Sequence, residues 1–174
     1  MISPRQGTNA PVLDDATGRT ASAESARVPG EQDLYLFREG SHGRLYELVG
    51  CHLHAGGATF RVWAPNAARV AVIGEFNEWS PHALSPRADS SGLWEGSVPG
   101  VVRGQAYKYR VSPDDGGPAF DKSDPFAFYA EPPPSTASRA WDLDYDWGDG
   151  EWMATRARHN ALDAPMSIYE VHLG

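Results

Sequence analysis

The stretch ATFRVWAPNAARVAVIGEFNEW, residues 58–79, decides the fold because its hydrophobic residues recur at every second position. Phe60 and Val62 alternate with Arg61 and Trp63 before a Pro-Asn pair interrupts the run, and the alternation then resumes up to the second phenylalanine. A period of two places successive side chains on opposite faces of an extended chain, as in a half-buried β-strand. The stretch therefore predicts two successive strands joined by a turn.

Two further alternating runs follow, GLWEGSVPG at residues 92–100 and GQAYKYRV at residues 104–111. In the second run, Tyr107 and Tyr109 lie on one face and Lys108 on the other. Proline, glycine, serine and aspartate fill the segments between the runs, as expected of turns and loops. Short alternating strands separated by turns predict an all-β protein, a small β-sandwich.

The segments on either side of this region differ in composition and predict five parts. Residues 1–32 lack aromatic residues and are rich in small and polar ones, so we expect a disordered tail. Residues 33–54 are a lead-in that starts with a short helix, and residues 55–130 are the sandwich. Residues 131–164, which open with three prolines, predict an extended linker that packs on the domain surface. Residues 165–174 contain β-branched and aromatic residues and predict one more strand.

Composition and charge exclude several classes of partner. The 174 residues carry a net charge of −8 without a Lys/Arg cluster, which argues against nucleic acid and anionic membranes as partners. No apolar stretch approaches the length of a membrane-spanning helix. The single cysteine, Cys51, excludes an internal disulfide and fits a reducing cytoplasm.

Trp79 and Lys108 are the candidate binding residues. Trp79 follows a predicted strand end in a loop, where its indole offers a flat apolar face for a sugar ring; the alternative is a core plug at one end of the sandwich. Lys108 lies opposite the tyrosines, so its ammonium can donate hydrogen bonds to sugar hydroxyls; the alternative is a solvated strand lysine.

The residues taken alone give no catalytic or metal site. The chain lacks nucleophile-elbow, P-loop and HExxH motifs, and no cofactor is implied. Asp142, Asp144 and Asp146 have the spacing of a calcium loop, but its glycine and its terminal glutamate are missing. His52 and His54 share a strand face without a third ligand, so no metal is expected.

Five stretches, taken in order, resemble the amino-terminal part of bacterial 1,4-α-glucan (glycogen) branching enzymes of the α-amylase superfamily. They are FRVWAPNAARVAVIGEFNEW, GLWEGSVPG, GQAYKYRV, KSDPFAF and APMSIYEVHLG. The resemblance covers residues 33–174. It implies that residues 55–130 form an immunoglobulin-like sandwich, a family-48 carbohydrate-binding module. It further implies that residues 165–174 are the first strand of a (β/α)₈ catalytic barrel that is otherwise absent from the chain.

The resemblance also implies site residues and a reaction. Trp79 and Lys108 match glucan contacts of such modules, and Asn77 in the same loop is a further candidate. Phe120 stands near a second aromatic of some relatives, although the turn SPDDGGPAF before it differs from theirs. The family transfers an α-1,4-glucan segment to a 6-hydroxyl with two carboxyl groups on later barrel strands. The resemblance therefore assigns no catalytic residue here, and it makes an α-1,4-glucan and the catalytic barrel the expected partners.

Two other readings remain open from the sequence. One is a stand-alone glycogen-binding or scaffold protein, against which SIYEVHLG argues because such a protein has no use for the opening strand of a barrel. The other is the front end of a debranching or trehalose-forming relative, which has the same order of sandwich and barrel.

Overall fold

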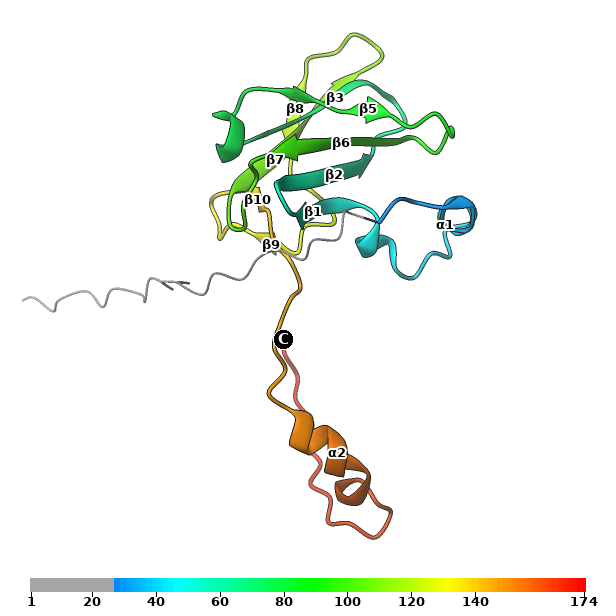
Figure 1. Cartoon of the computed structure of the whole chain (residues 1–174), viewed down its shortest axis with the longest axis vertical. Helices are drawn as coiled ribbons and strands as arrows, with labels where there is room; N and C mark the ends of the chain where they lie inside the picture. The colour runs from blue at the N-terminus through cyan, green and yellow to red at the C-terminus, as the bar shows by residue number, and fades with distance from the viewer. Residues whose placement is uncertain (1–26) are drawn as a thin grey trace, which may run out of the picture. The chain divides into compact units, whose positions relative to one another are not determined.

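The computed structural model describes residues 27–174 and separates them into two compact units, one ending at Asp142 and the other Leu143–Gly174 (Figure 1). Most of the tail expected at residues 1–32 lies outside the described residues. Its last residues are ordered, however, because the first helix, α1, already begins at Glu31.

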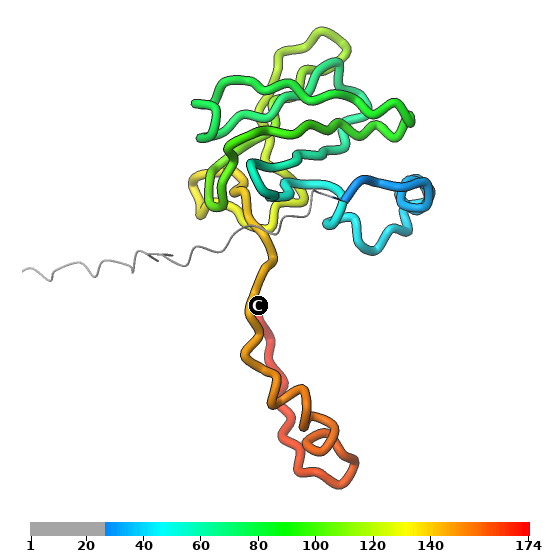
Figure 2. Tube along the Cα trace, viewed as in Figure 1, coloured from blue at the N-terminus to red at the C-terminus, as the bar shows by residue number. Residues whose placement is uncertain are grey.

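The first unit contains two antiparallel sheets, which confirms the predicted β-sandwich. Sheet A has the strand order β1 (Gly50–His54), β2 (Gly57–Trp63), β6 (Leu93–Pro99) and β5 (Ser85–Pro86). Sheet B has the order β4 (His82–Ala83), β3 (Ala67–Gly74), β7 (Ala106–Pro113), β10 (Ser138–Arg139) and β9 (Tyr129–Ala130), and β8 (Phe120–Lys122) also pairs with β7. The four longest strands are the four alternating runs of the sequence. Figure 2 follows the chain as it passes between the two sheets.

The core lies between the sheets and is built by the predicted alternation. Phe60 is fully buried and packs against Tyr107 of the opposite sheet, with ring centroids 5.1 Å apart. Phe76, just after β3, turns back into the core and lies 5.6 Å from Phe60. Trp63, on the other face of β2, remains 57% exposed. Burial of these large aromatic surfaces provides the main driving force for joining the sheets.

A buried carboxylate, that of Asp124, ties sheet B together. It accepts hydrogen bonds from the hydroxyls of Tyr107, at 2.6 Å, and Tyr109, at 3.3 Å, and from the Phe126 backbone N–H, at 2.8 Å. Its own backbone N–H donates to Ser138 Oγ on β10, at 2.8 Å. Loss of hydration outweighs these hydrogen bonds and raises the pKa of Asp124. The group is costly to bury and is therefore fully hydrogen-bonded.

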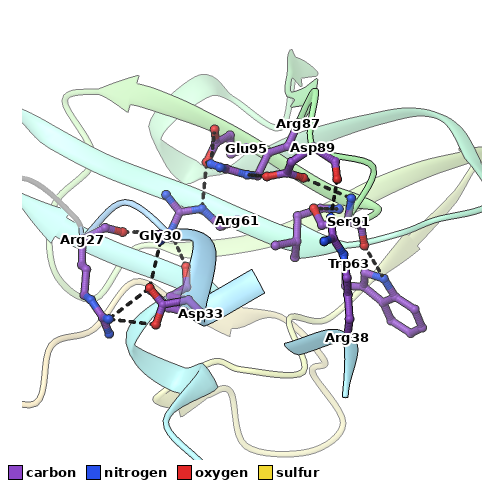
Figure 3. Close-up of polar contacts among 12 residues, drawn as sticks. Arg27, Gly30, Asp33, Arg38, Arg61, Trp63, Arg87, Asp89, Ser91 and Glu95 are labelled. Carbon is purple, nitrogen blue, oxygen red and sulfur yellow. Dashed lines mark hydrogen bonds and ion pairs between the residues drawn. The ribbon is translucent and has the colours of Figure 1, made fainter. Parts of the chain in front are cut away.

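A buried arginine, Arg61, attaches the lead-in to the outer face of sheet A (Figure 3). Its Nε donates to Glu95 on β6 at 2.8 Å, and its Nη1 donates to the backbone carbonyls of Leu48 and Arg27. Phe37 of α1 (Glu31–Arg38) also packs edge-on against Trp63, with ring centroids 6.2 Å apart. The lead-in, including η1 (Leu45–Glu47), therefore occupies part of this face.

Two further carboxylates stabilise this attachment. Asp33 accepts a hydrogen bond from the Gly30 backbone N–H at 2.9 Å, which is the main reason that its pKa is lowered, and it also pairs with Arg27 at 2.8 Å. Burial opposes ionisation of Asp89, but hydrogen bonds from Ser91 and Arg87 prevail and lower its pKa to about 2. Arg87 also pairs with Glu95 at 2.9 Å, so the network is continuous from Asp89 to Arg61.

The segment after residue 130 differs from the extended linker that was expected. Its first part joins sheet B through β10, and the second unit contains a ten-residue helix, α2 (Gly150–His159). The helix forms because this stretch is rich in good helix formers, with Glu151 in its first turn and Arg156 and Arg158 in its last turn, where each complements the helix dipole. The prolines upstream obscured this local signal.

Residues 165–174 form no strand in the structure. Ile168, Tyr169 and Leu173 are 83%, 86% and 92% exposed. A β-branched, aromatic stretch without a neighbouring strand cannot satisfy its backbone hydrogen bonds in a sheet. The assignment of residues 165–174 to a catalytic barrel stays a prediction.

We predict that Asp124→Ala lowers the free energy of unfolding by about 3 kcal/mol, because it leaves two buried tyrosine hydroxyls and one backbone N–H without their acceptor. Urea unfolding followed by tryptophan fluorescence measures the loss. The exposed Asp115→Ala provides the control. A loss below about 1 kcal/mol would show that water replaces the carboxylate.

Asp124→Asn should reveal the pH dependence of this group. Because the folded pKa lies above the model-peptide value of 3.8, the folded protein binds the proton more tightly than the unfolded chain. The stability advantage of the wild type over Asp124→Asn should therefore shrink as the pH rises from about 3.8 through the raised pKa, and stay constant above it. Urea titrations between pH 4 and 7 test this, and pH-independent differences would contradict it.

Candidate carbohydrate-binding site

The loop that follows β3 is shaped by the side chain of Asn77, at the end of η2 (Glu75–Asn77). Its Oδ1 accepts a hydrogen bond from the Gly74 backbone N–H at 2.8 Å, and its Nδ2 donates to the Val72 carbonyl at 3.2 Å. The backbone N–H of Trp79 then donates to the Gly74 carbonyl at 2.8 Å. Both ends of the Asn77 amide are thus engaged within the chain, so Asn77 positions the loop. A direct contact with sugar stays a prediction.

Trp79 is held on the surface by an unusual backbone. Glu78 and Trp79 have φ angles of 53° and 60°, in the left-handed region that side chains other than glycine rarely adopt. Such a residue costs about 1 kcal/mol or more, so two in succession persist only because the surrounding hydrogen bonds impose them. Trp79 is 41% exposed, whereas Phe76 fills the adjacent part of the core. The loop therefore presents Trp79 and does not use it as a core plug.

Lys108 projects from the outer face of sheet B, between the buried Tyr107 and Tyr109. Its Nζ donates to Thr136 Oγ1 at 2.8 Å. Lys108 pairs with Ile73 across β3 and β7, and the next pair along is Gly74 with Tyr107. Since the loop is bonded back to Gly74, the fold brings the Trp79 backbone and Lys108 to the same corner of sheet B.

Phe120 does not share this face. It pairs with Val111 of β7, and Lys122 pairs with Tyr109, so Phe120 lies on the core-facing side at the edge of the sheet. Its ring is 44% exposed, with Lys122 Nζ 5.5 Å from the ring centroid. Opposite residues in an antiparallel pair point to the same side. The register therefore separates Phe120 from Lys108, and its role in binding stays a prediction.

Thr136 is a partner of Lys108 that the sequence did not reveal. It lies in the proline-rich segment, which returns to sheet B and is held there by a hydrogen bond from Ser123 Oγ to the Thr136 carbonyl, at 2.6 Å. Lys108 and Thr136 are 28 positions apart, and β10, which follows Thr136 and pairs with β7, has only two residues. So short a strand carries no periodic signal.

A neighbouring arginine on the same face has a carboxylate partner. Arg110 makes two hydrogen bonds to Asp121, at 2.7 and 2.9 Å, and this pairing lowers the pKa of Asp121. Within residues 27–174, no three His, Cys, Asp or Glu side chains are grouped as a metal ion would require. The same described residues include no helix that is both long and apolar enough to cross a membrane.

The sandwich is similar to a known class of domain. Residues 48–127 match the family of carbohydrate-binding module 48, described as the isoamylase N-terminal domain. These residues include strands β1 to β8 of the first unit. Over most of its length, the chain is similar to part of the 1,4-alpha-glucan branching enzymes GlgB, in agreement with the resemblance seen in the sequence.

The curated relatives support this assignment over more than four fifths of the chain. The enzyme of Albidiferax ferrireducens is 58% identical over 150 residues, covering 84% of this chain and 24% of the relative. That of Aromatoleum aromaticum is 62% identical over 146 residues, covering 83% and 23%. The chain thus spans about a quarter of the length of these relatives. Both relatives are named 1,4-alpha-glucan branching enzyme.

Among solved structures, a pullulanase from Anoxybacillus sp. LM18-11, complexed with maltotetraose, aligns with 70% of this chain and 16% of that one, with a TM-score of 0.48 and 22% identity.

Asn77→Ala should lower the free energy of unfolding by about 2 kcal/mol, because two hydrogen bonds that hold the loop are lost together. It should also increase the mobility of the Trp79 indole. The fluorescence anisotropy of Trp79, obtained as the difference between proteins with Trp79 and with Trp79→Phe, should therefore be lower in Asn77→Ala. Asn66→Ala, at an exposed turn position, serves as the control. Equal stability of the two variants would mean that the loop does not depend on the amide.

Proposed function

We propose that this chain is the glucan-binding region of a cytoplasmic glycogen branching enzyme and that the corner of sheet B around Trp79 and Lys108 binds an α-1,4-glucan. The observation that carries the proposal is the loop geometry, in which two left-handed residues and three hydrogen bonds keep Trp79 exposed. Strain of this kind persists where it has a function. The family of the module and the names of its relatives supply the class of ligand.

The two side chains offer complementary chemistry to a sugar. The indole face can stack against the apolar C–H face of a glucose ring. The Lys108 ammonium carries three N–H donors, one of which is directed to Thr136, and it can donate to sugar hydroxyls. Cleavage of a glycosidic bond uses a pair of carboxyl groups, and neither Trp79 nor Lys108 carries one. The site would therefore hold a glucan chain and not cleave it.

In the whole enzyme, the module would keep glucan close to a catalytic barrel. The proposed reaction breaks an α-1,4 bond and transfers the released segment to a 6-hydroxyl, through two carboxyl groups that are not assigned to this chain. A bound module raises the local concentration of the polymer at the barrel without adding a contact to the reacting atoms. Residues 165–174 would supply the first barrel strand.

Trp79→Ala should weaken binding to glycogen about tenfold, equivalent to roughly 1.4 kcal/mol, while the melting temperature stays within about 2 °C. Affinity electrophoresis in gels that contain glycogen measures the change. Trp147→Ala is the matched control, since Trp147 is 72% exposed and belongs to the second unit. Lys108→Met, which keeps the aliphatic stem but removes the donors, should weaken binding to a smaller extent.

Equal retention of wild type and Trp79→Ala would remove Trp79 from the binding site and leave the family assignment intact. Loss of retention in Trp147→Ala alone would move the site to the second unit.

A further inference from the structure

The outer face of sheet B continues from Lys108 onto the strands at its far edge. Ala106, two residues before Lys108 on β7, pairs with Arg139 of β10, and Arg139 pairs with Tyr129 of β9. Ser138, the other β10 residue, points to the core, where its Oγ meets the Asp124 backbone N–H. Because opposite residues share a face and neighbours alternate, Arg139 and Tyr129 lie on the same face as Lys108.

Trp141 joins this face by the same alternation. Ala140, between Arg139 and Trp141, is fully buried in the core. The rings of Tyr129 and Trp141 are stacked, with centroids 4.9 Å apart and an interplanar angle of 29°. The Arg103 guanidinium lies 4.0 Å from the centroid of the Trp141 ring. Three side chains, from β9, the chain after β10 and the loop before β7, thus form one aromatic platform, Tyr129–Trp141–Arg103.

The backbone beneath this platform is fixed. Ala140 exchanges hydrogen bonds with the loop before β7, donating to the Gln105 carbonyl at 2.9 Å and accepting from the Gly104 N–H at 2.7 Å. Arg139 Nη1 donates to the Gly104 carbonyl at 2.6 Å, and its Nη2 lies 3.3 Å from Glu131. The platform is therefore held in place before any ligand arrives, which lowers the entropic cost of binding.

Tyr129 remains 49% exposed although its ring is stacked on Trp141. A stack that served only to close the end of the sandwich would bury the phenol ring further. An exposed aromatic ring held at a fixed angle offers an apolar face on which a pyranose ring can stack. Neighbouring strands are about 4.8 Å apart, so Tyr129 lies about 10 Å from β7 across the sheet.

We propose that the Tyr129–Trp141–Arg103 platform is a second contact for α-glucan, so that a chain bound at Trp79 and Lys108 continues across β7 and β10 to Tyr129. The proposal rests on the proposed function of the first site and extends it to longer ligands. Tyr129 stacks on a sugar ring, while Trp141 and Arg103 support the Tyr129 ring and hold its angle. Lys108 lies between the two aromatic contacts and donates to the intervening hydroxyls.

The test compares short and long linear maltooligosaccharides on the 174-residue chain. Maltotriose should occupy only the Trp79 site, and maltoheptaose should reach both contacts. We expect Tyr129→Ala and Tyr129→Leu to weaken binding of maltoheptaose about fivefold by isothermal titration calorimetry and to leave maltotriose unchanged. Tyr129→Phe, which keeps the ring, should retain the affinity for maltoheptaose. Tyr46→Ala is the control, because Tyr46 is 41% exposed in the lead-in.

The outcomes separate the two proposals. If Trp79→Ala weakens both sugars but Tyr129→Leu weakens neither, the second contact is overturned and the first site stands; the stack is then packing or an interface with another part of the enzyme. If maltotriose also responds to Tyr129→Leu, the platform is the primary site and the extended track is overturned. If the chain binds neither sugar, both proposals fail. Tyr129→Leu keeps apolar bulk on Trp141, so it covers the case in which Tyr129→Ala unfolds.

Discussion

The buried carboxylate of Asp124 is the interaction on which the rest of sheet B depends. It accepts hydrogen bonds from Tyr107 and Tyr109 on β7, and the backbone N–H of Asp124 donates to Ser138 Oγ on β10. With both tyrosines pointing inward, alternation forces Lys108 outward. With Ser138 inward, the same rule places Arg139 and Trp141 outward. One desolvated group thus sets the outward residues of two strands that are far apart in the sequence.

The outer faces of the two sheets differ in what lies on them. Arg61 draws the lead-in onto sheet A through the carbonyls of Leu48 and Arg27, and Phe37 packs on Trp63 there. A buried guanidinium without these acceptors would be strongly destabilising, so the attachment is hard to undo. The side chains of sheet B that carry the proposed site lie on the other outer face. The side on which the sandwich presents the proposed binding groups therefore depends on where Arg61 and Asp124 are buried.

The sequence alone predicted the strands in which hydrophobic and polar residues alternate over several positions. Four alternating runs became β2, β3, β6 and β7, because a period of two over seven or eight residues depends on no distant partner. The strands β8, β9 and β10 have only two or three residues; β8 and β10 pair with β7, and β9 pairs with β10. Trp79 and Lys108 could be named from their local pattern, whereas Thr136, Tyr129 and Trp141 depend on pairing across the sheet. The side of the sheet on which Phe120 lies could not be predicted, because a register cannot be read from one strand alone.

The cations on the outer face of sheet B differ in their partners, and this difference bears on a neutral ligand. Arg110 pairs with Asp121, Arg139 with Glu131, and Arg103 with Asp142, at 2.7, 3.3 and 3.6 Å. Lys108 instead donates to the hydroxyl of Thr136. A glucan carries no charge, so it cannot repay the separation of an ion pair, but its hydroxyls can replace or extend a hydroxyl contact at little cost. Of these four cations, Lys108 is thus the one whose existing contact already resembles the contact that a sugar would make.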